Sequence, residues 1–168
     1  MRSWNGLIQE FPTSAKWLTA LFLVALSYGF FAGIRFVDHT TSVNPYGIEE
    51  NYLGNEEVED AAVMKFEKTQ TEMLTMFHTH VMSLAMVFFL SGILVLMTDA
   101  PKGWKKFLAI EPLISVFFTF GGIYWMWKGF YWLKYIVFIS GALMTICFGL
   151  GVILVLYNLI KKPKAELV

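Results

Sequence analysis

The 26-residue stretch 135–160, YIVFISGALMTICFGLGVILVLYNLI, carries no charge and would be apolar on every side of a helix. A helix rises about 1.5 Å per residue, so about 20 residues cross the roughly 30 Å hydrocarbon core of a bilayer. The stretch lacks the period-two alternation of a membrane β-strand. It therefore predicts a transmembrane helix.

Three more blocks have the same character: 17–34 and 73–98, which are uncharged, and 107–127, in which Glu111 is the one charge. The chain is 57% hydrophobic and 15% charged, against about 45–50% and about 25% in soluble domains. The first block is longer than the usual apolar core of a signal peptide, and no A-x-A-like cleavage site follows it, so we expect a retained helix. We expect an all-α integral membrane protein, a four-transmembrane-helix bundle. It would form one domain over 1–168, with helices at about 16–37, 73–98, 106–127 and 132–160.

Several classes of chemistry are excluded. One cysteine cannot form an internal disulfide, a Cys-rich zinc site or a thiol redox pair. The chain has no phosphate-binding glycine motif and no HExxH, CxxCH or GxSxG. The sequence therefore assigns no catalytic residue, and we expect neither a nucleic-acid partner nor catalysis by this chain alone.

Positive charges indicate the orientation. Eight lie at the end of the expected bundle that carries both termini: Arg2, Lys16, Lys102, Lys105, Lys106, Lys161, Lys162 and Lys164. Five lie at the other end: Arg35, Lys65, Lys68, Lys128 and Lys134. Cytoplasmic loops carry the excess of Lys and Arg, so both termini are predicted to be cytoplasmic. In a bacterial inner membrane, the connection 38–72 would then be a periplasmic loop.

The 38–72 loop is strongly acidic, with nine Asp and Glu against two Lys, a net charge of −7. One interpretation is a solvated connector. The other is a docking surface for a basic periplasmic protein such as a cytochrome, because complementary charge accelerates association. The residues expected to form that surface are Glu56, Glu57, Glu59 and Asp60.

Aromatic and small residues mark further surfaces. Seven of the twelve residues 124–135 are aromatic, which is typical of an interfacial belt and is also compatible with a ring-stacking quinone site. Small residues at four-residue spacing favour close helix contacts; they are Ala25, Gly29 and Gly33, and Gly141, Thr145 and Gly149. A polar stripe facing lipid would be costly, so the stripe in the third helix should face the bundle interior; it comprises Glu111, Ser115, Thr119 and Gly122.

The three histidines, His39, His78 and His80, are the main candidates for function. All would lie near the periplasmic end. Because His78 and His80 are about 200° apart around a helix, they cannot bind one metal from the same face. The face of His80 carries more polar side chains, so we expect His80 to point inward, although the small residues on the face of His78 leave the choice open.

Several uses of these histidines stay open. A haem b needs two axial ligands, which could be drawn from His78, His80, His39 and Met126 or from another subunit. Copper could be bound by His80 with the thioethers of Met73 and Met76. A quinone headgroup could bond to a histidine, or the histidines could simply lock the bundle. A proton relay is disfavoured, because Glu111 is expected near the cytoplasmic start of its helix and no ionisable residue lies midway.

Three motifs resemble a family of small four-helix inner-membrane proteins of Gram-negative bacteria. They are an H-x-H opening the second helix, within HTHVMSLAMVFFLSGILV at 78–95, a Glu-Pro at 111–112 and a Ser-Gly-Ala at 140–142. The segment YGIEENYLG at 46–54 is also similar. Some relatives carry a c-type haem site in an enlarged loop, which implies periplasmic electron transfer. Such a site is absent here, because Cys147 lies within the fourth helix.

The expected function is therefore a small integral-membrane component of a respiratory or electron-transfer assembly. A haem, metal or quinone site would lie near the periplasmic end of the second helix. The partners would be the lipid bilayer and other membrane subunits or further copies of the chain. The alternative is a non-catalytic structural or assembly subunit that binds no cofactor.

Overall fold

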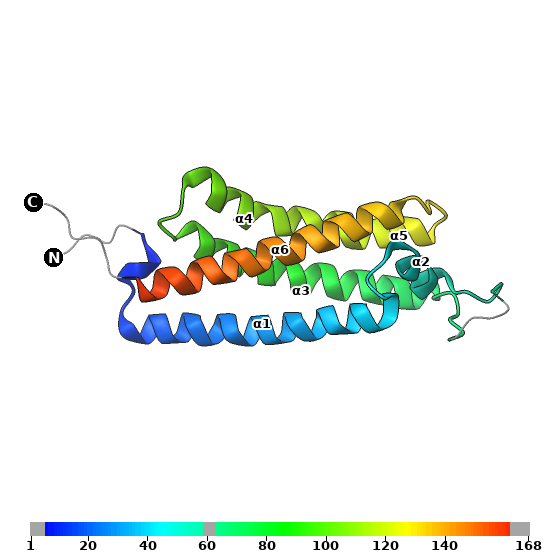
Figure 1. Cartoon of the computed structure of the whole chain (residues 1–168), viewed down its shortest axis with the longest axis horizontal. Coiled ribbons are helices and arrows are strands. Elements are labelled where there is room, and N and C mark those ends of the chain that lie inside the picture. Colours follow the sequence, from blue (N-terminus) through cyan, green and yellow to red (C-terminus); the bar gives the residue numbers. More distant parts are fainter. Residues whose placement is uncertain (1–5, 59–62, 162–168) are drawn as a thin grey trace, which may run out of the picture.

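The computed structural model describes residues 6–58 and 63–161, and within these ranges every regular element is helical. The elements in chain order are η1 (Ile8–Glu10), α1 (Thr13–Thr41), α2 (Pro45–Leu53), α3 (Gln70–Leu96), α4 (Lys102–Val116), the π-helical η2 (Phe117–Gly121), α5 (Gly122–Trp127) and α6 (Leu133–Ile160). α4, η2 and α5 follow one another without a break and form one long helical segment. The chain therefore has four long helical rods, with α2 packed at one end (Figure 1); in chain order the rods are α1, α3, α4–η2–α5 and α6.

Each of the four rods is long and apolar enough to cross a membrane. The predicted all-helical membrane bundle is thus confirmed. The start of α1 and the end of α6 lie at the same end of the bundle, and α2 lies at the opposite end (Figure 1).

The long helices begin before the predicted apolar blocks, and at α3 a polar cap sets the start. α3 starts at a capping box, in which the Thr69 side chain accepts a hydrogen bond from the Glu72 amide and Glu72 accepts one from the Thr69 amide. α1 ends where Ser42 adopts a left-handed conformation with φ of 51°. Capping is independent of apolarity, so hydropathy alone underestimates the length of these helices.

The segment 38–72, expected as a loop, contains the helix α2. Asn44 caps it by accepting a hydrogen bond from the Gly47 amide at 2.8 Å, and Pro45 occupies the first helical position. Proline suits this position because its fixed φ is helical and its missing N–H would be unpaired there anyway.

The core lies between α3, α4 and α6. Gly92 on α3 brings that helix against α4, since a Cβ added there would lie 3.1 Å from the Ala109 carbonyl oxygen. α1 is bound more loosely: its buried residues are Leu23 and Thr41, and Phe30 packs on Phe88 and Phe148 with ring centroids 6.1 and 4.5 Å apart. Three rods thus form the packed unit, and α1 lies along its side.

The small-residue row of α1 faces away from this packed unit. Ala25, Gly29 and Gly33 are exposed, and a Cβ added at either glycine would meet nothing within 4 Å. The predicted close contact between this row and another helix is therefore not made within this chain. It stays a prediction about a helix of another chain.

The polar stripe of the third rod faces inward as predicted, because Glu111, Ser115, Thr119 and Gly122 are all buried. The prediction that Glu111 lies near the cytoplasmic start of its helix was wrong. α4 starts at Lys102, so Glu111 is about 14 Å along a 26-residue rod. It lies beside Cys147, at the centre of α6. An ionisable residue therefore does lie midway through the bundle.

Candidate functional site

The His80 ring is held in one orientation by two contacts. Its Nδ1 lies 2.9 Å from the Met76 carbonyl oxygen, and the ring stacks on Phe120 of η2 with centroids 4.9 Å apart and planes 26° apart. A carbonyl oxygen only accepts hydrogen bonds, so Nδ1 is the donor of this bond, and in the neutral ring Nε2 keeps a lone pair. The side chain is exposed. This is the arrangement of a metal-binding or hydrogen-bonding imidazole, whose second nitrogen is fixed by a backbone carbonyl.

The expectation that His80 points into the bundle was wrong. It rested on polar neighbours that need partners, yet these hydroxyls bond to their own helix. Ser83 donates to the Thr79 carbonyl at 2.6 Å, and Thr79 donates to the Thr75 carbonyl at 2.7 Å. Serine and threonine commonly satisfy themselves in this way, so these hydroxyls need no partner helix. Thr79, His80 and Ser83 are exposed, although the His80 ring rests on Phe120 of η2.

His78 is also exposed, and it makes no hydrogen bond or ring contact within the described part of the chain. His78 and His80 are about 12 and 15 Å from the first residue of α3. That places both in the apolar part of the span. Ionisable side chains in membranes normally face protein or water, and neither imidazole is buried by the described part of this chain.

The other proposed ligands are not brought to His80. Met126 and Met73 are fully buried in the core, whereas His39 is exposed near the end of α1. Met76 is half-buried and contributes its backbone carbonyl to the His80 ring. Within residues 6–58 and 63–161, no group of three or more His, Cys, Asp or Glu could hold a metal. A haem bound through His80 would therefore take its second axial ligand from another chain.

Aromatic side chains continue from His80 towards the α2 end. Phe77 of α3 lies 6.0 Å from the Tyr124 ring, and Tyr124 lies 6.2 Å from Trp127. The indole N–H of Trp127 donates to the Lys68 carbonyl at 2.9 Å, which ties α5 to the start of α3. The outermost rings of the aromatic segment are exposed, as an interfacial belt requires; they are Trp125, Phe130, Tyr131, Trp132 and Tyr135.

The acidic segment is folded against the bundle, which the sequence did not predict. Lys134 of α6 bonds to Glu49 at 2.5 Å and lies 4.2 Å from the Tyr46 ring centroid, and the Tyr46 and Tyr135 hydroxyls are 3.2 Å apart. The cap signal Asn44-Pro45 is the one sequence feature that could have revealed α2.

Beyond α2 the chain turns back on itself. The Asn55 amide donates to the Lys65 carbonyl at 3.0 Å, and the Asn55 side chain accepts from the Lys65 amide at 2.7 Å. Glu56 and Glu57 are exposed at this turn and form no ion pair with the described residues. Of the predicted docking residues, Glu59 and Asp60 lie outside the described residues.

The four apolar rods and their polar, capped ends define a multi-pass helical membrane protein. The chain belongs to the Aq_1264_TM family, a transmembrane helical domain whose model matches residues 42–166. No curated protein and no solved structure shows a significant match. The matched range begins immediately after α1, so α2 and the three tightly packed rods constitute the family domain.

Proposed function

We propose that this protein is a membrane subunit of an electron-transfer assembly and that His80 binds the redox group at the outer face of α3. The proposal rests on the orientation and hydrogen bonding of the His80 ring. Its Nδ1–H is bonded to the Met76 carbonyl, its face rests on Phe120, and its Nε2 has no partner in the described chain. An imidazole oriented in this way is ready to accept a hydrogen bond or to bind a metal.

A quinone is the redox group that this surface fits best. Its reduced quinol form can donate a hydroxyl hydrogen bond to Nε2 of His80, its ring can pack against the exposed His80 imidazole, which Phe120 supports from behind, and it reaches the site through the bilayer. A haem b or a copper ion needs further ligands. Met73 and Met126 are buried, His39 lies on another helix, and on α3 only the half-buried Met76 and His78, on a different side of the helix, remain. Either metal centre would therefore be shared with a second membrane subunit or a second copy of the chain.

The acidic turn next to α2 is the proposed docking surface for a basic protein such as a cytochrome. Glu56 and Glu57 supply exposed, unpaired charge, and the Glu49–Lys134 contact fixes the neighbouring helix to the bundle. A rigid charged surface favours docking, since less conformational freedom is lost on binding. With the orientation proposed from the charge bias, this surface faces the periplasm of a bacterial inner membrane.

The alternative is an assembly subunit without a cofactor. The exposed surface of α3 carries the hydroxyls of Thr75, Thr79 and Ser83 and, on different sides of the helix, the two histidines. Small polar side chains of this kind are common where transmembrane helices meet. In this alternative, the histidines bond to a helix of another subunit.

Purification in mild detergent, followed by solvent extraction for quinone, an absorption spectrum and metal analysis, separates the two functions. We expect bound quinone in the wild type and about tenfold weaker binding in His80→Ala, the change that corresponds to loss of about 1.4 kcal/mol. His39→Ala is the matched control, because His39 is exposed at the end of a different helix. A wild-type protein that contains no quinone, haem or metal would support the assembly subunit instead.

A further inference from the structure

Glu111 is an ionisable side chain that the proposed redox site does not use. It is 8% exposed, its Oε1 accepts a hydrogen bond from Ser115, and its Oε2 is buried without a hydrogen-bond partner. It lies beside Cys147, halfway along α6. A carboxyl group with one unsatisfied oxygen is thus enclosed near the middle of the membrane-spanning bundle.

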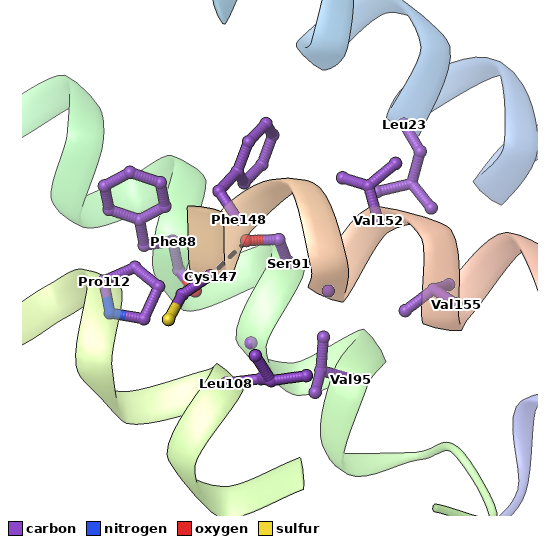
Figure 2. A pocket seen from close by; sticks show the side chains of 12 residues that line it. Leu23, Phe88, Ser91, Val95, Leu108, Pro112, Cys147, Phe148, Val152 and Val155 are labelled. Atoms are coloured by element: carbon purple, nitrogen blue, oxygen red, sulfur yellow. Dashed lines mark hydrogen bonds between the residues drawn. The ribbon is translucent and has the colours of Figure 1, made fainter. Parts of the chain in front are cut away.

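A small cavity lies beside Pro112 and Cys147, the neighbours of Glu111 in the chain and in space. Its volume is about 10 Å³, which is room for about one water molecule. Cys147, Pro112 and Ser91 are among the side chains that line it (Figure 2). Pro112 has no N–H to donate to the Leu108 carbonyl one turn earlier, and Leu108 lines the same cavity. The cavity therefore lies beside a helical turn that lacks one backbone donor, one residue after Glu111.

No positive charge compensates Glu111 within the described chain. Each cation that forms an ion pair among the described residues does so with an acid other than Glu111. These cations are Arg35, Lys65, Lys68, Lys134 and Lys161. The titratable group beside Glu111 is Cys147. The neighbouring residues of α3 at the cavity, Phe88, Ser91 and Gly92, are not titratable, and α1 contributes Leu23. An ionised carboxylate that has only the Ser115 hydroxyl and the weak Cys147 thiol as donors and no counter-ion is costly in such surroundings, and the neutral acid is less so.

Hydroxyl groups extend from Glu111 towards the α2 end, whereas the buried hydroxyls on the other side, Ser91 and Thr98, donate to carbonyls of α3. Ser115 and Thr119 follow on the same rod, and Thr119 Oγ1 lies 2.8 Å from Ser140 Oγ on α6. Thr119 belongs to the π-helical turn η2, a local rearrangement that is frequent at functional sites. Towards the opposite end, the buried neighbours also include the apolar Leu108, Val95 and Val155. The polar track therefore points to the α2 end.

We propose that Glu111 is an exchangeable proton-binding site at the centre of the bundle, reached from the α2 end along Ser115, Thr119 and Ser140. The carboxyl group holds the proton, and the hydroxyls pass it by exchanging hydrogen bonds. Ile123, Met126 and Val137 form an apolar layer between Thr119 and the α2 end, so a proton that enters from that end has to cross this layer first. The proposal does not depend on His80 or on any redox group.

Infrared spectroscopy of the protein in lipid nanodiscs tests the proton site directly. The wild type at neutral pH should show the carbonyl stretch of a protonated carboxylic acid, and the band should be missing from Glu111→Gln and shifted in Ser115→Ala. Exchanging NaCl for KCl should leave the band unchanged. A wild type without the band, or a band that disappears on adding sodium at fixed pH, would overturn the proposal.

Exchange into deuterium oxide tests the route. The band should shift as the acid proton exchanges, and Thr119→Val should slow this shift at least tenfold. Thr145→Val is the matched control, because Thr145 lies on α6 and donates to the Gly141 carbonyl of its own helix. A band that never shifts would mark a static acid, and equal rates in both variants would exclude the track.

Discussion

His80 and Glu111 are ionisable residues in apolar spans, and the structure gives them opposite surroundings. Glu111 is enclosed by three rods, whereas His80 lies on an outer face with one ring nitrogen satisfied. The sequence predicted the inward direction of Glu111 correctly, because its polar neighbours recur at four-residue spacing on one face. The same reasoning failed for His80, because the hydroxyls on its face bond to their own backbone.

Gly47 provides a prediction at the level of one residue. A Cβ there would lie 1.9 Å from the Thr41 carbonyl oxygen, and a backbone atom cannot move aside easily. We expect Gly47→Ala to lower the unfolding free energy by about 1–3 kcal/mol, the usual cost of overpacking. Thermal unfolding in detergent, followed by tryptophan fluorescence, measures the effect.

Gly29→Ala is the control for this substitution, since nothing lies within 4 Å of the added Cβ. Its melting temperature should equal that of the wild type or slightly exceed it, because alanine favours a helix more than glycine does. Equal destabilisation by both substitutions would contradict the close approach of α2 to the end of α1.

Among the elements, α2 and η2 were not predicted, and their causes differ. α2 is a nine-residue helix with a modest apolar content, so its contacts with α6 through Glu49 and Tyr46 stabilise it. η2 lies within an apolar block whose composition predicts an ordinary α-helix. Hydropathy cannot reveal a change from i→i+4 to i→i+5 bonding, which here accompanies the contact between Thr119 and Ser140.

The turn that follows α2 provides a prediction about docking. Glu56→Gln combined with Glu57→Gln should slow the association of the nanodisc-embedded protein with a basic c-type cytochrome and flatten its salt dependence. Folding should survive, because exposed charges contribute little to stability. Surface-binding kinetics over a series of ionic strengths provide the measurement.

Asp38→Asn serves as the control for net charge in that experiment, because Asp38 is already paired with Arg35 at 3.0 Å. It should leave the association rate nearly unchanged. If the double variant and the wild type share one on-rate and one salt slope, the turn does not dock a basic protein.

At the scale of the whole molecule, the bundle has two chemically distinct ends. One end carries α2 and the acidic turn, and the other carries the start of α1, the α3–α4 connection and the end of α6 (Figure 1). There, Lys161 binds Asp99 at 2.6 Å, and this hydrogen bond raises the pKa of the Lys161 ammonium group. Three of the positive charges that indicate a cytoplasmic location, Arg2, Lys162 and Lys164, lie outside the described residues.

Cysteine labelling tests the predicted orientation. A cysteine at Glu56 should react with a membrane-impermeant thiol reagent in intact spheroplasts, and one at Gly103 should react only after lysis. Both positions are exposed, and the native Cys147 is buried and gives little background. The reverse pattern would place the acidic turn in the cytoplasm and exclude a periplasmic partner.

The sequence by itself determined the class of fold. Four long apolar blocks leave a chain of this length few alternatives, since each must cross a membrane as a helix to satisfy its backbone hydrogen bonds. It also determined that the Glu111 stripe faces inward, because helical periodicity places those residues on one side.

Only the tertiary structure decided the depth of Glu111, the exposure of His80 and the folding of the acidic segment. Each depends on where helices begin, tilt and meet, which caps such as Thr69 and contacts such as Lys134–Glu49 and Thr119–Ser140 establish. These interactions join residues that are far apart in the chain or satisfy polar groups locally. A pattern of polar and apolar residues along one helix therefore cannot reveal them.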